Sequence, residues 1–278
     1  MWKDISAGYA EFAQVLESFS LAAFNEAAEV LRYTEMFGLE KACQEISADQ
    51  TKSAAEPIKA NFRDLCRLHY LALSRRVLTT LEFGSGYSTV VLAHAAKLLR
   101  EHFGQWAADN VRVENPFHVF SIEEEQRYME ITNRRLGERF SDYATVQRSS
   151  VDMILHDNRI ATVYTRLPNV SPDFIYLDGP SQFGTTSELN GFRFDNVARM
   201  PMSADILRWE FFFEPGTLVL VDGRTANSRF LQAYLKRNWV HHHDLVGDVH
   251  YFELQEDPLG KFNQIKLEFC LDGKWLLS

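Results

Sequence analysis

The sequence predicts an α/β fold: a mostly parallel, doubly wound sheet with a C-terminal antiparallel hairpin and an N-terminal helical segment. Three short apolar runs rich in β-branched residues predict buried strands at residues 77–83, 172–179 and 216–223. The first run breaks at a glycine turn and leads into a helical pattern, and the other two each end in Asp-Gly. Strands separated by helical patterns are typical of a parallel sheet.

The glycine turn Gly84-Ser85-Gly86 joins the first strand to a helix whose N-cap we predict at Ser88. A long connection is expected from Arg100 to Pro116. Glycines allow backbone N–H groups to approach a ligand, and a helix N-terminus favours a carboxylate or phosphate. A strand, turn and helix that bind no ligand are the alternative interpretation.

Two common nucleotide motifs do not fit this turn. A dinucleotide fingerprint has a third glycine, where this chain has Thr89, and an acidic residue about 20 residues further on. Glu123 is the first suitable acid on a strand end, 37 residues after Gly86. A P-loop is excluded because no Gly-Lys-Ser/Thr follows the turn.

Polar residues also follow the next two predicted strands. The strand predicted at residues 117–122 is followed by Glu123, whose carboxylate can accept two hydrogen bonds from a ribose diol. The alternative is that Glu123, Glu124 and Glu125 only offset the dipole of the following helix. A third strand at residues 144–147 is followed by Ser150 in a serine-rich turn.

Asp178 and Asp222 end the fourth and fifth predicted strands, and a glycine follows each of them. In an open parallel sheet the carboxyl ends of the strands line the ligand crevice. We therefore expect both carboxylates near the reacting end of a bound cofactor. Capping of the next helix is the alternative for each aspartate.

The segment Glu82-Phe83-Gly84-Ser85-Gly86 resembles the acidic-x-Gly-x-Gly motif of the class I S-adenosylmethionine (SAM)-dependent methyltransferases. Residues 77–270 resemble the small-molecule O-methyltransferases of that Rossmann-like fold. The resemblance implies that Glu82 and the turn hold the methionine part of SAM, Glu123 its ribose and Ser150 its adenine. It adds three residues to the cofactor site: Ser85, Ser88 and Asp178. It also implies that Asp178 or Asp222 assists the loss of a proton from an acceptor hydroxyl.

Many such enzymes bind Mg²⁺ through an acid after the fourth strand and two residues after the fifth. Asp178 and Asp222 match two of these positions, whereas the third is Gly223, followed by Arg224. Two residues are candidates for the missing ligand: Asn227 and Asp195. Mg²⁺ bound by Asp178 and Asp222 therefore stays an open alternative.

The two ends of the chain frame this domain. Residues 1–76 are predicted to be helical, with a linker at 47–57, and either cover the active site or form a homo-oligomer contact. Residues 77–278 form the SAM-binding domain, in which 240–254 and 265–271 are expected to pair as the final antiparallel hairpin. The three histidines at 241–243 fit a polar strand start better than a metal site.

Composition and charge indicate which kinds of partner and which compartment to expect. A net charge of −9 argues against nucleic acid and acidic membranes as partners. Three widely spaced cysteines, the lack of a signal-peptide pattern and the lack of a long apolar run predict a cytoplasmic protein. The expected partner is a small polar acceptor such as a sugar. Two alternatives remain: a catalytically silent SAM-binding or interaction protein, and an NAD-dependent dehydrogenase on a similar scaffold.

Overall fold

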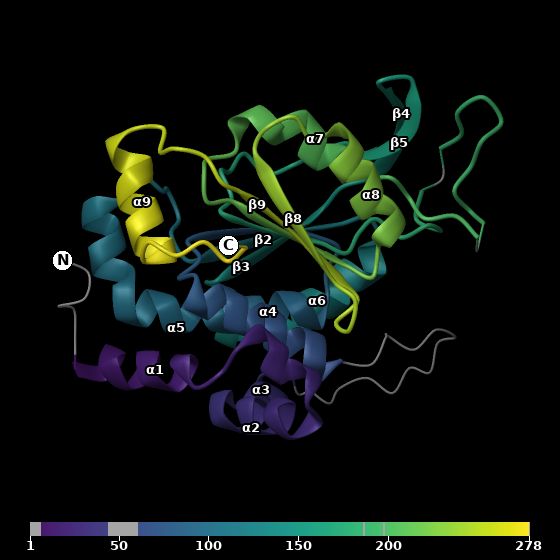
Figure 1. The fold of residues 1–278 in the computed structure, drawn as a ribbon. Coiled ribbons are helices and arrows are strands. Elements are labelled where there is room, and N and C mark those ends of the chain that lie inside the picture. Colours follow the sequence, from purple (N-terminus) through teal and green to yellow (C-terminus); the bar gives the residue numbers. More distant parts are fainter. Residues whose placement is uncertain (1–6, 44–60, 186, 197, 278) are drawn as a thin grey trace.

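A seven-stranded sheet forms the centre of the protein. The structure is a computed structural model that describes residues 7–43, 61–185, 187–196 and 198–277. The strand order is β3-β2-β1-β6-β7-β9-β8 (Figure 1). The strands are β1 Thr79–Phe83, β2 His118–Glu123, β3 Ala144–Arg148, β6 Phe174–Leu177, β7 Leu218–Asp222, β8 Trp239–Asp244 and β9 Val249–Leu254. The first five of these are parallel and β9 is antiparallel to both of its neighbours, which confirms the predicted fold class.

Helices cover both faces of the sheet (Figure 1). One layer contains α4 Phe62–Ser74, α5 Tyr87–Asn110, α6 Gln126–Phe140 and α9 Lys261–Leu271. The helices α1 Ala7–Glu17, η2 Leu21–Asn25, α2 Ala27–Phe37 and α3 Leu39–Ala42 pack outside this layer. The other layer contains α7 Asp205–Trp209, η3 Glu210–Phe212 and α8 Thr225–Tyr234. Among the described helices, none combines the length and apolarity needed to cross a membrane.

Alternation along each strand divides the core in two. Leu218 and Leu220 of β7 pack in the cluster that contains α4 and α5, whereas Val219 and Val221 pack in the cluster that contains α7 and α8. Successive strand residues point to opposite faces, so a parallel strand covered by helices on both sides is apolar throughout. This explains why these strands appear as continuous apolar runs in the sequence.

The C-terminal hairpin is correctly predicted in kind but wrongly placed. It forms over residues 239–254, where β8 and β9 pair. Residues 265–271 are not a strand but the end of α9. A short apolar run fits the residue spacing of a strand and that of a helix equally well. The helix is favoured because Phe269 packs against Phe103 and Trp106 of α5, with ring centroids 5.2 and 4.2 Å away.

Two expectations about the first βα unit are also corrected. α5 begins at Tyr87, so Ser88 lies inside its first turn and is not the N-cap. The N–H of Gly86 donates to Oγ1 of Thr89 at 3.1 Å. The helix continues to Asn110, through most of the expected connection, and buries Phe103 and Ala107 on the way.

A small hairpin between β3 and β6 was not predicted. β4 Val151–His156 and β5 Arg159–Tyr164 pair antiparallel. Asp157 and Asn158 join them with φ values of 46° and 59°. Positive φ at both central residues is the requirement of a tight hairpin turn, and Asp and Asn accept it more readily than most residues.

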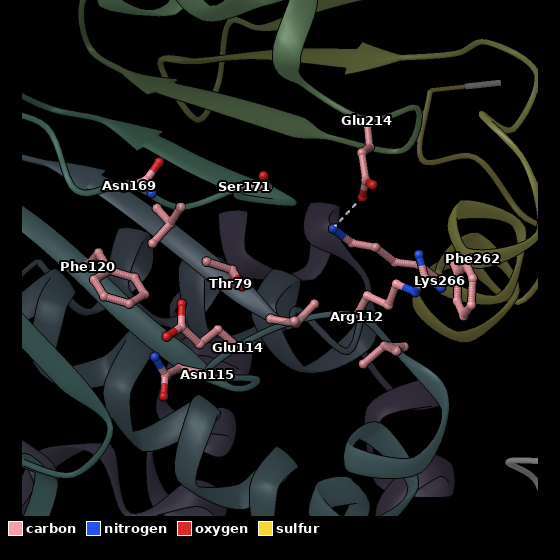
Figure 2. A pocket seen from close by; sticks show the side chains of 13 residues that line it. Thr79, Arg112, Glu114, Asn115, Phe120, Asn169, Ser171, Glu214, Phe262 and Lys266 are labelled. Carbon is pink, nitrogen blue, oxygen red and sulfur yellow. Dashed lines mark hydrogen bonds and ion pairs between the residues drawn. The ribbon is translucent and has the colours of Figure 1, made fainter.

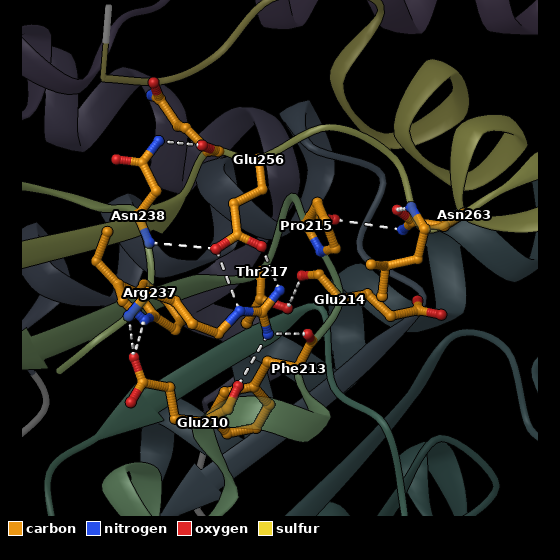
Figure 3. A network of polar contacts seen from close by, with 12 residues as sticks. Glu210, Phe213, Glu214, Pro215, Thr217, Arg237, Asn238, Glu256 and Asn263 are labelled. Atoms are coloured by element: carbon orange, nitrogen blue, oxygen red, sulfur yellow. Dashed lines mark hydrogen bonds and ion pairs between the residues drawn. The ribbon is translucent and has the colours of Figure 1, made fainter.

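A network of polar contacts lies at the edge of the sheet opposite the glycine turn (Figure 3). Nη1 of Arg237 donates to the carbonyl oxygens of Glu210 and Phe213 at 3.0 and 2.5 Å, and Nη2 donates to Glu256 at 2.5 Å. Oε1 of Glu210 accepts in turn from the backbone N–H of Arg237 at 2.7 Å. These bonds join the segment before β7 to the strand ends of β8 and β9. The predicted linker at 47–57 lies outside the described residues.

A buried hydrogen-bond chain joins the outer helices to the domain. Oη of Tyr33 on α2 lies 2.9 Å from Nδ1 of His69 on α4, and Nε2 of His69 lies 2.9 Å from Nδ1 of His94 on α5. Burial, and then the neighbouring His94, hold the pKa of His69 well below its ordinary value. Burial, and then nearby cations, lower the pKa of His94 to about 4. Both rings are therefore neutral in the folded protein at neutral pH.

We expect this chain to make stability depend on pH. Below about pH 6.5 the unfolded chain binds protons that the folded histidines do not bind, so the two histidines lower the free energy of unfolding as the pH falls toward 4. The raised pKa values of Glu123 and Asp64 act in the opposite direction. The slope is up to about 1.4 kcal/mol per pH unit for each histidine. Urea unfolding at pH 7.5, 6.5 and 5.5 measures it. His94→Gln should gain stability relative to the wild type as the pH falls, and a difference between the two proteins that does not change with pH would contradict this account.

Candidate functional site

β1 is the strand at which the order of the sheet reverses. The chain runs outward from β1 through β2 to β3, and then returns to place β6 and β7 on the other side of β1. Ligands of open α/β sheets bind outside the carboxyl ends of the strands at such a reversal. The predicted site residues follow the carboxyl ends of β1, β2, β3, β6 and β7, so the fold brings them to one edge.

The two glycines of the turn after β1 differ in function. Gly84 has φ of 98°, and a Cβ there would lie 3.4 Å from the backbone of Asp178 and Gly179. That contact is an ordinary one, so it is the positive φ that favours glycine at this position. Gly86 is extended, with φ of 171°, and a Cβ there would meet no atom within 4 Å. Gly86 therefore presents an open backbone face that a ligand can approach.

Glu82 braces this turn from the inside. Its Oε2 accepts from Oγ1 of Thr89 at 2.6 Å and from the hydroxyl of Ser121. Ser88 is a further hydroxyl donor beside the same carboxylate. Burial raises the pKa of Glu82, against these hydrogen bonds. Oε1 is buried and has no partner of normal geometry among the described residues.

Glu123 contacts the turn directly. Its Oε2 accepts from the hydroxyl of Ser85 at 2.8 Å, and its Oε1 accepts from the backbone N–H of Glu125 at 3.0 Å. Burial, and then the Glu124 carboxylate, raise the pKa of Glu123 to about 7. Each carboxylate oxygen can accept one more hydrogen bond. The structure thus joins Ser85 and Glu123, two residues predicted for the cofactor.

Glu124 has a function that sequence reasoning missed. Its Oε2 accepts from Oη of Tyr164 on β5 at 3.0 Å, and its Oε1 accepts from the backbone N–H of Ser181 at 2.6 Å. It therefore ties the small hairpin and the loop after β6 to the end of β2. No local pattern indicates this, because both partners are distant in the sequence.

Ser150 lies between β3 and β4 and is exposed. Its hydroxyl is 2.8 Å from Oγ1 of Thr165, and its carbonyl oxygen accepts from the N–H of Thr165 at 2.9 Å. The preceding Ser149 donates its N–H to the carbonyl oxygen of Glu123 at 2.9 Å. Ser150 is thus at the predicted edge of the sheet, on the side of Glu123.

Asp178 stands beside Arg224 at the end of β6. Nε of Arg224 lies 3.6 Å from Oδ1 of Asp178, and the guanidinium also donates to the carbonyl oxygens of Asp178 and Pro180. Burial raises the pKa of Asp178 and Arg224 lowers it. Because the side chain is still 54% exposed, solvent screens both effects. Asp178 thus remains accessible to solvent at this edge of the sheet.

Asp222 accepts a hydrogen bond from Tyr176, whose Oη donates to Oδ2 at 2.7 Å. Burial raises the pKa of Asp222. Helix α4 brings a second charge pair to this end of the sheet, Asp64 and Arg67, 3.1 Å apart. Burial, and then the Asp222 carboxylate, raise the pKa of Asp64 to about 6. In the sequence these two residues look like an ordinary surface pair three residues apart.

The site does not fit the Mg²⁺ alternative. The described residues contain no group of three or more histidine, cysteine or acidic side chains arranged to hold a metal. The guanidinium of Arg224 beside Asp178 opposes a cation there. The two substitute ligands are engaged elsewhere: Asn227 accepts from the N–H of Ser203, and Asp195 pairs with Arg193.

The predicted histidine cluster forms a short chain. His241 lies 3.0 Å from His250, which lies 3.1 Å from Oγ1 of Thr225 at the start of α8. His243 stacks on His250 with ring centroids 3.7 Å apart. These contacts fit the structural interpretation of the polar strand.

Solved methyltransferases resemble this fold distantly. No family model and no curated protein match the sequence. The O-methyltransferase TomG of Streptomyces achromogenes, solved with SAM, is 14% identical over 81% of this chain and 95% of its own, with a TM-score of 0.44. PaMTH1 of Podospora anserina, bound to S-adenosylhomocysteine (SAH), is 10% identical over 82% and 88%, with a TM-score of 0.46. A Bacillus cereus O-methyltransferase with SAH is 14% identical over 91% and 100%, with a TM-score of 0.42. Function must therefore be argued from the site.

We expect Gly179→Ala to disrupt the edge that carries the site. A Cβ at Gly179 would lie 2.5 Å from Oη of Tyr164 and 2.7 Å from the backbone nitrogen of Gly84. Because one of these atoms is backbone, the loss of stability should be about 2–3 kcal/mol in denaturant unfolding. The control Gly104→Ala lies within α5, where alanine is the better helix former and should stabilise slightly. Equal stability of the two variants would contradict the close packing of these turns.

Proposed function

We propose that the protein is a SAM-dependent methyltransferase that methylates a hydroxyl group of a small polar molecule. The observation that carries the proposal is the contact of Glu123 with Ser85. It joins a strand-end carboxylate on β2 to the glycine turn after β1, at the point where the order of the sheet reverses. A nucleoside with a free ribose diol is the ligand that such a carboxylate recognises.

The residues present fit SAM. Glu123 has acceptor capacity left for two ribose hydroxyls. The open backbone of Gly86 at the start of α5 and the carboxylate of Glu82 behind it suit the methionine part, which carries both a carboxylate and an ammonium group. Ser150 lies on the side of Glu123 where the adenine is expected. When bound, SAM supplies a methyl group that its sulfonium sulfur has already activated.

Chemistry then requires alignment of the acceptor oxygen, removal of its proton and exclusion of water. Asp178 is the accessible carboxylate that can take this proton. Asp222, fixed by Tyr176, can hold and orient the hydroxyl. Arg224 holds the loop after β6 and keeps the Asp178 carboxylate in place. Asp64 and Arg67 of α4 border the same end of the sheet, so the N-terminal segment contributes to the acceptor side.

The partners of this enzyme are proposed from charge and exposure. The net charge of −9 disfavours nucleic acid and acidic membrane partners. The three cysteines are free and buried, which suits a reducing cytoplasm. On α2, Leu31 and Met36 are 53% and 49% exposed and support a homo-oligomer contact through the N-terminal helices.

We expect Glu123→Ala to weaken SAM binding about 10- to 100-fold, because two hydrogen bonds to a charged acceptor are lost. The fold should be intact by circular dichroism, and calorimetry measures the affinity.

The affinity for SAM should also depend on pH. In the wild type the ligand binds the ionised form of Glu123, whose pKa is about 7. Affinity should therefore fall about tenfold per pH unit below 7. Glu123→Gln should abolish this pH dependence, and unchanged affinity in both variants would remove Glu123 from the site. Titration with NAD tests the dehydrogenase alternative, which requires that NAD binds and SAM does not.

We expect Asp178→Asn to lower kcat about 100-fold or more, because the amide cannot take the acceptor proton. Asp222→Asn should lower it less, while SAH affinity stays within about threefold for both variants. Methyl transfer from labelled SAM to an acceptor found among small polyols and phenols is the measurement. Asp157→Asn, in the distant β4–β5 turn, is the matched control. If SAM binds but no acceptor is methylated, the protein is a silent SAM binder. If methylation occurs and Asp178→Asn leaves kcat unchanged, Asp178 does not take the acceptor proton.

A further inference from the structure

A concave site lies at the edge of the sheet opposite the candidate SAM site. A pocket of about 310 Å³ opens where the parallel strands begin, whereas the residues of the candidate SAM site follow their ends (Figure 2). Thr79, the first residue of β1, forms part of its floor. We call it the amino-edge pocket. Its volume is at the lower end of the range for small-molecule sites.

Four parts of the chain surround Thr79 and Phe120 in this pocket. Residues 111–115 lead into β2, residues 169–171 lead into β6, Glu214 precedes β7, and α9 closes the side. Nζ of Lys266 on α9 pairs with Glu214 at 3.0 Å. Lys266 is only 7% exposed, so this ion pair is a fixed wall of the pocket.

Arg112 and Phe262, both exposed, line a second side of the pocket. The guanidinium carbon of Arg112 lies 3.5 Å from the centroid of the Phe262 ring. This cation–π contact fixes a long side chain that would otherwise be mobile. Phe120, from β2, lies on the other side of the pocket (Figure 2). The pocket thus has an aromatic surface at two places.

The remaining polar side chains are not used by the protein. Within the described part of the chain, Glu114, Asn115, Asn169 and Ser171 make no hydrogen bond or ion pair. Figure 2 shows them around one opening, from two different connections. Together they offer carboxylate and amide acceptors, amide donors and a hydroxyl. A set of donors and acceptors around a concave surface matches a ligand that has both kinds of group.

Charge decides the class of ligand. The lining holds two cations, Arg112 and Lys266, and two anions, Glu114 and Glu214, so its formal charge is zero. An ionic ligand gains no net attraction from such a lining, whereas a neutral ligand rich in hydroxyl groups can use each unpaired group. We propose that the amino-edge pocket binds a neutral polyhydroxylated molecule of about monosaccharide size. This proposal does not depend on methyl transfer at the other edge.

Two-dimensional NMR of the full-length protein tests this with glucose and myo-inositol as probes. At least one should shift the amide signals of residues 111–115 and 169–171 with a dissociation constant of about 1–10 mM. Glu114→Ala and Asn169→Ala should each weaken it about tenfold, because each removes a side-chain partner from an exposed connection. Asn133→Ala, on the exposed face of α6, is the matched control and should change nothing.

Three results would overturn the proposal: no shift with either probe up to about 50 mM, unchanged binding in both pocket variants, or stronger binding of inorganic phosphate at the same residues. Glu123→Ala distinguishes this site from the SAM site. It should leave polyol binding unchanged, so failure of the methyltransferase proposal leaves this one standing.

Discussion

The close approach of two backbone turns determines the geometry of the crevice. The turn after β1 at Gly84 packs against the turn after β6 at Gly179. Gly179 has no room for a side chain, and Gly84 has a positive φ of 98° that side chains rarely adopt. This contact holds the ends of the two central strands together. The residues that follow β2, β6 and β7 are therefore presented around one point of the sheet, and their side chains need no flexible loop to meet there.

Side chains that stand behind this contact maintain it. Glu124 joins Tyr164 and Ser181, and Arg224 donates to the carbonyl oxygens on either side of Gly179. The loop after β6 is thus held from both flanks. The exposed carboxylate of Asp178 and the glycine turn are fixed relative to each other before any ligand arrives, which lowers the entropy cost of binding.

The parts of the fold that could be predicted are those that local pattern encodes. Strands buried on both faces appear as continuous apolar runs in the sequence. The end of each run therefore locates the acid at the strand end, as for Glu123, Asp178 and Asp222. The β4–β5 hairpin carried a local signal as well, since Asp157 and Asn158 are suited to positive φ. The run at 265–271 was misassigned because its spacing fits a strand and a helix alike, and packing on α5 decides.

The site residues that could not be predicted depend on distant packing. Glu124 meets Tyr164 across 40 residues of sequence, and nothing near either residue indicates the partner. The same holds for Asp64 and Arg67, which lie near Asp222 only because α4 packs on the sheet at that point. A helix surface pair and a pair that borders a crevice have the same local sequence, so only the tertiary structure separates them.

Helix α4 connects the stability of the domain to its candidate acceptor side. With 13 residues it is about 20 Å long, roughly the length of the strands it covers. At one end Arg75 pairs with the buried Glu253 at 2.6 Å and donates to the carbonyl oxygen of Gly216. At the other end Arg67 and Asp64 lie beside Asp222. Because a buried ion pair is costly to break, the first end fixes the position of the second. The proposed acceptor side therefore includes residues of the N-terminal segment whose position is fixed by packing.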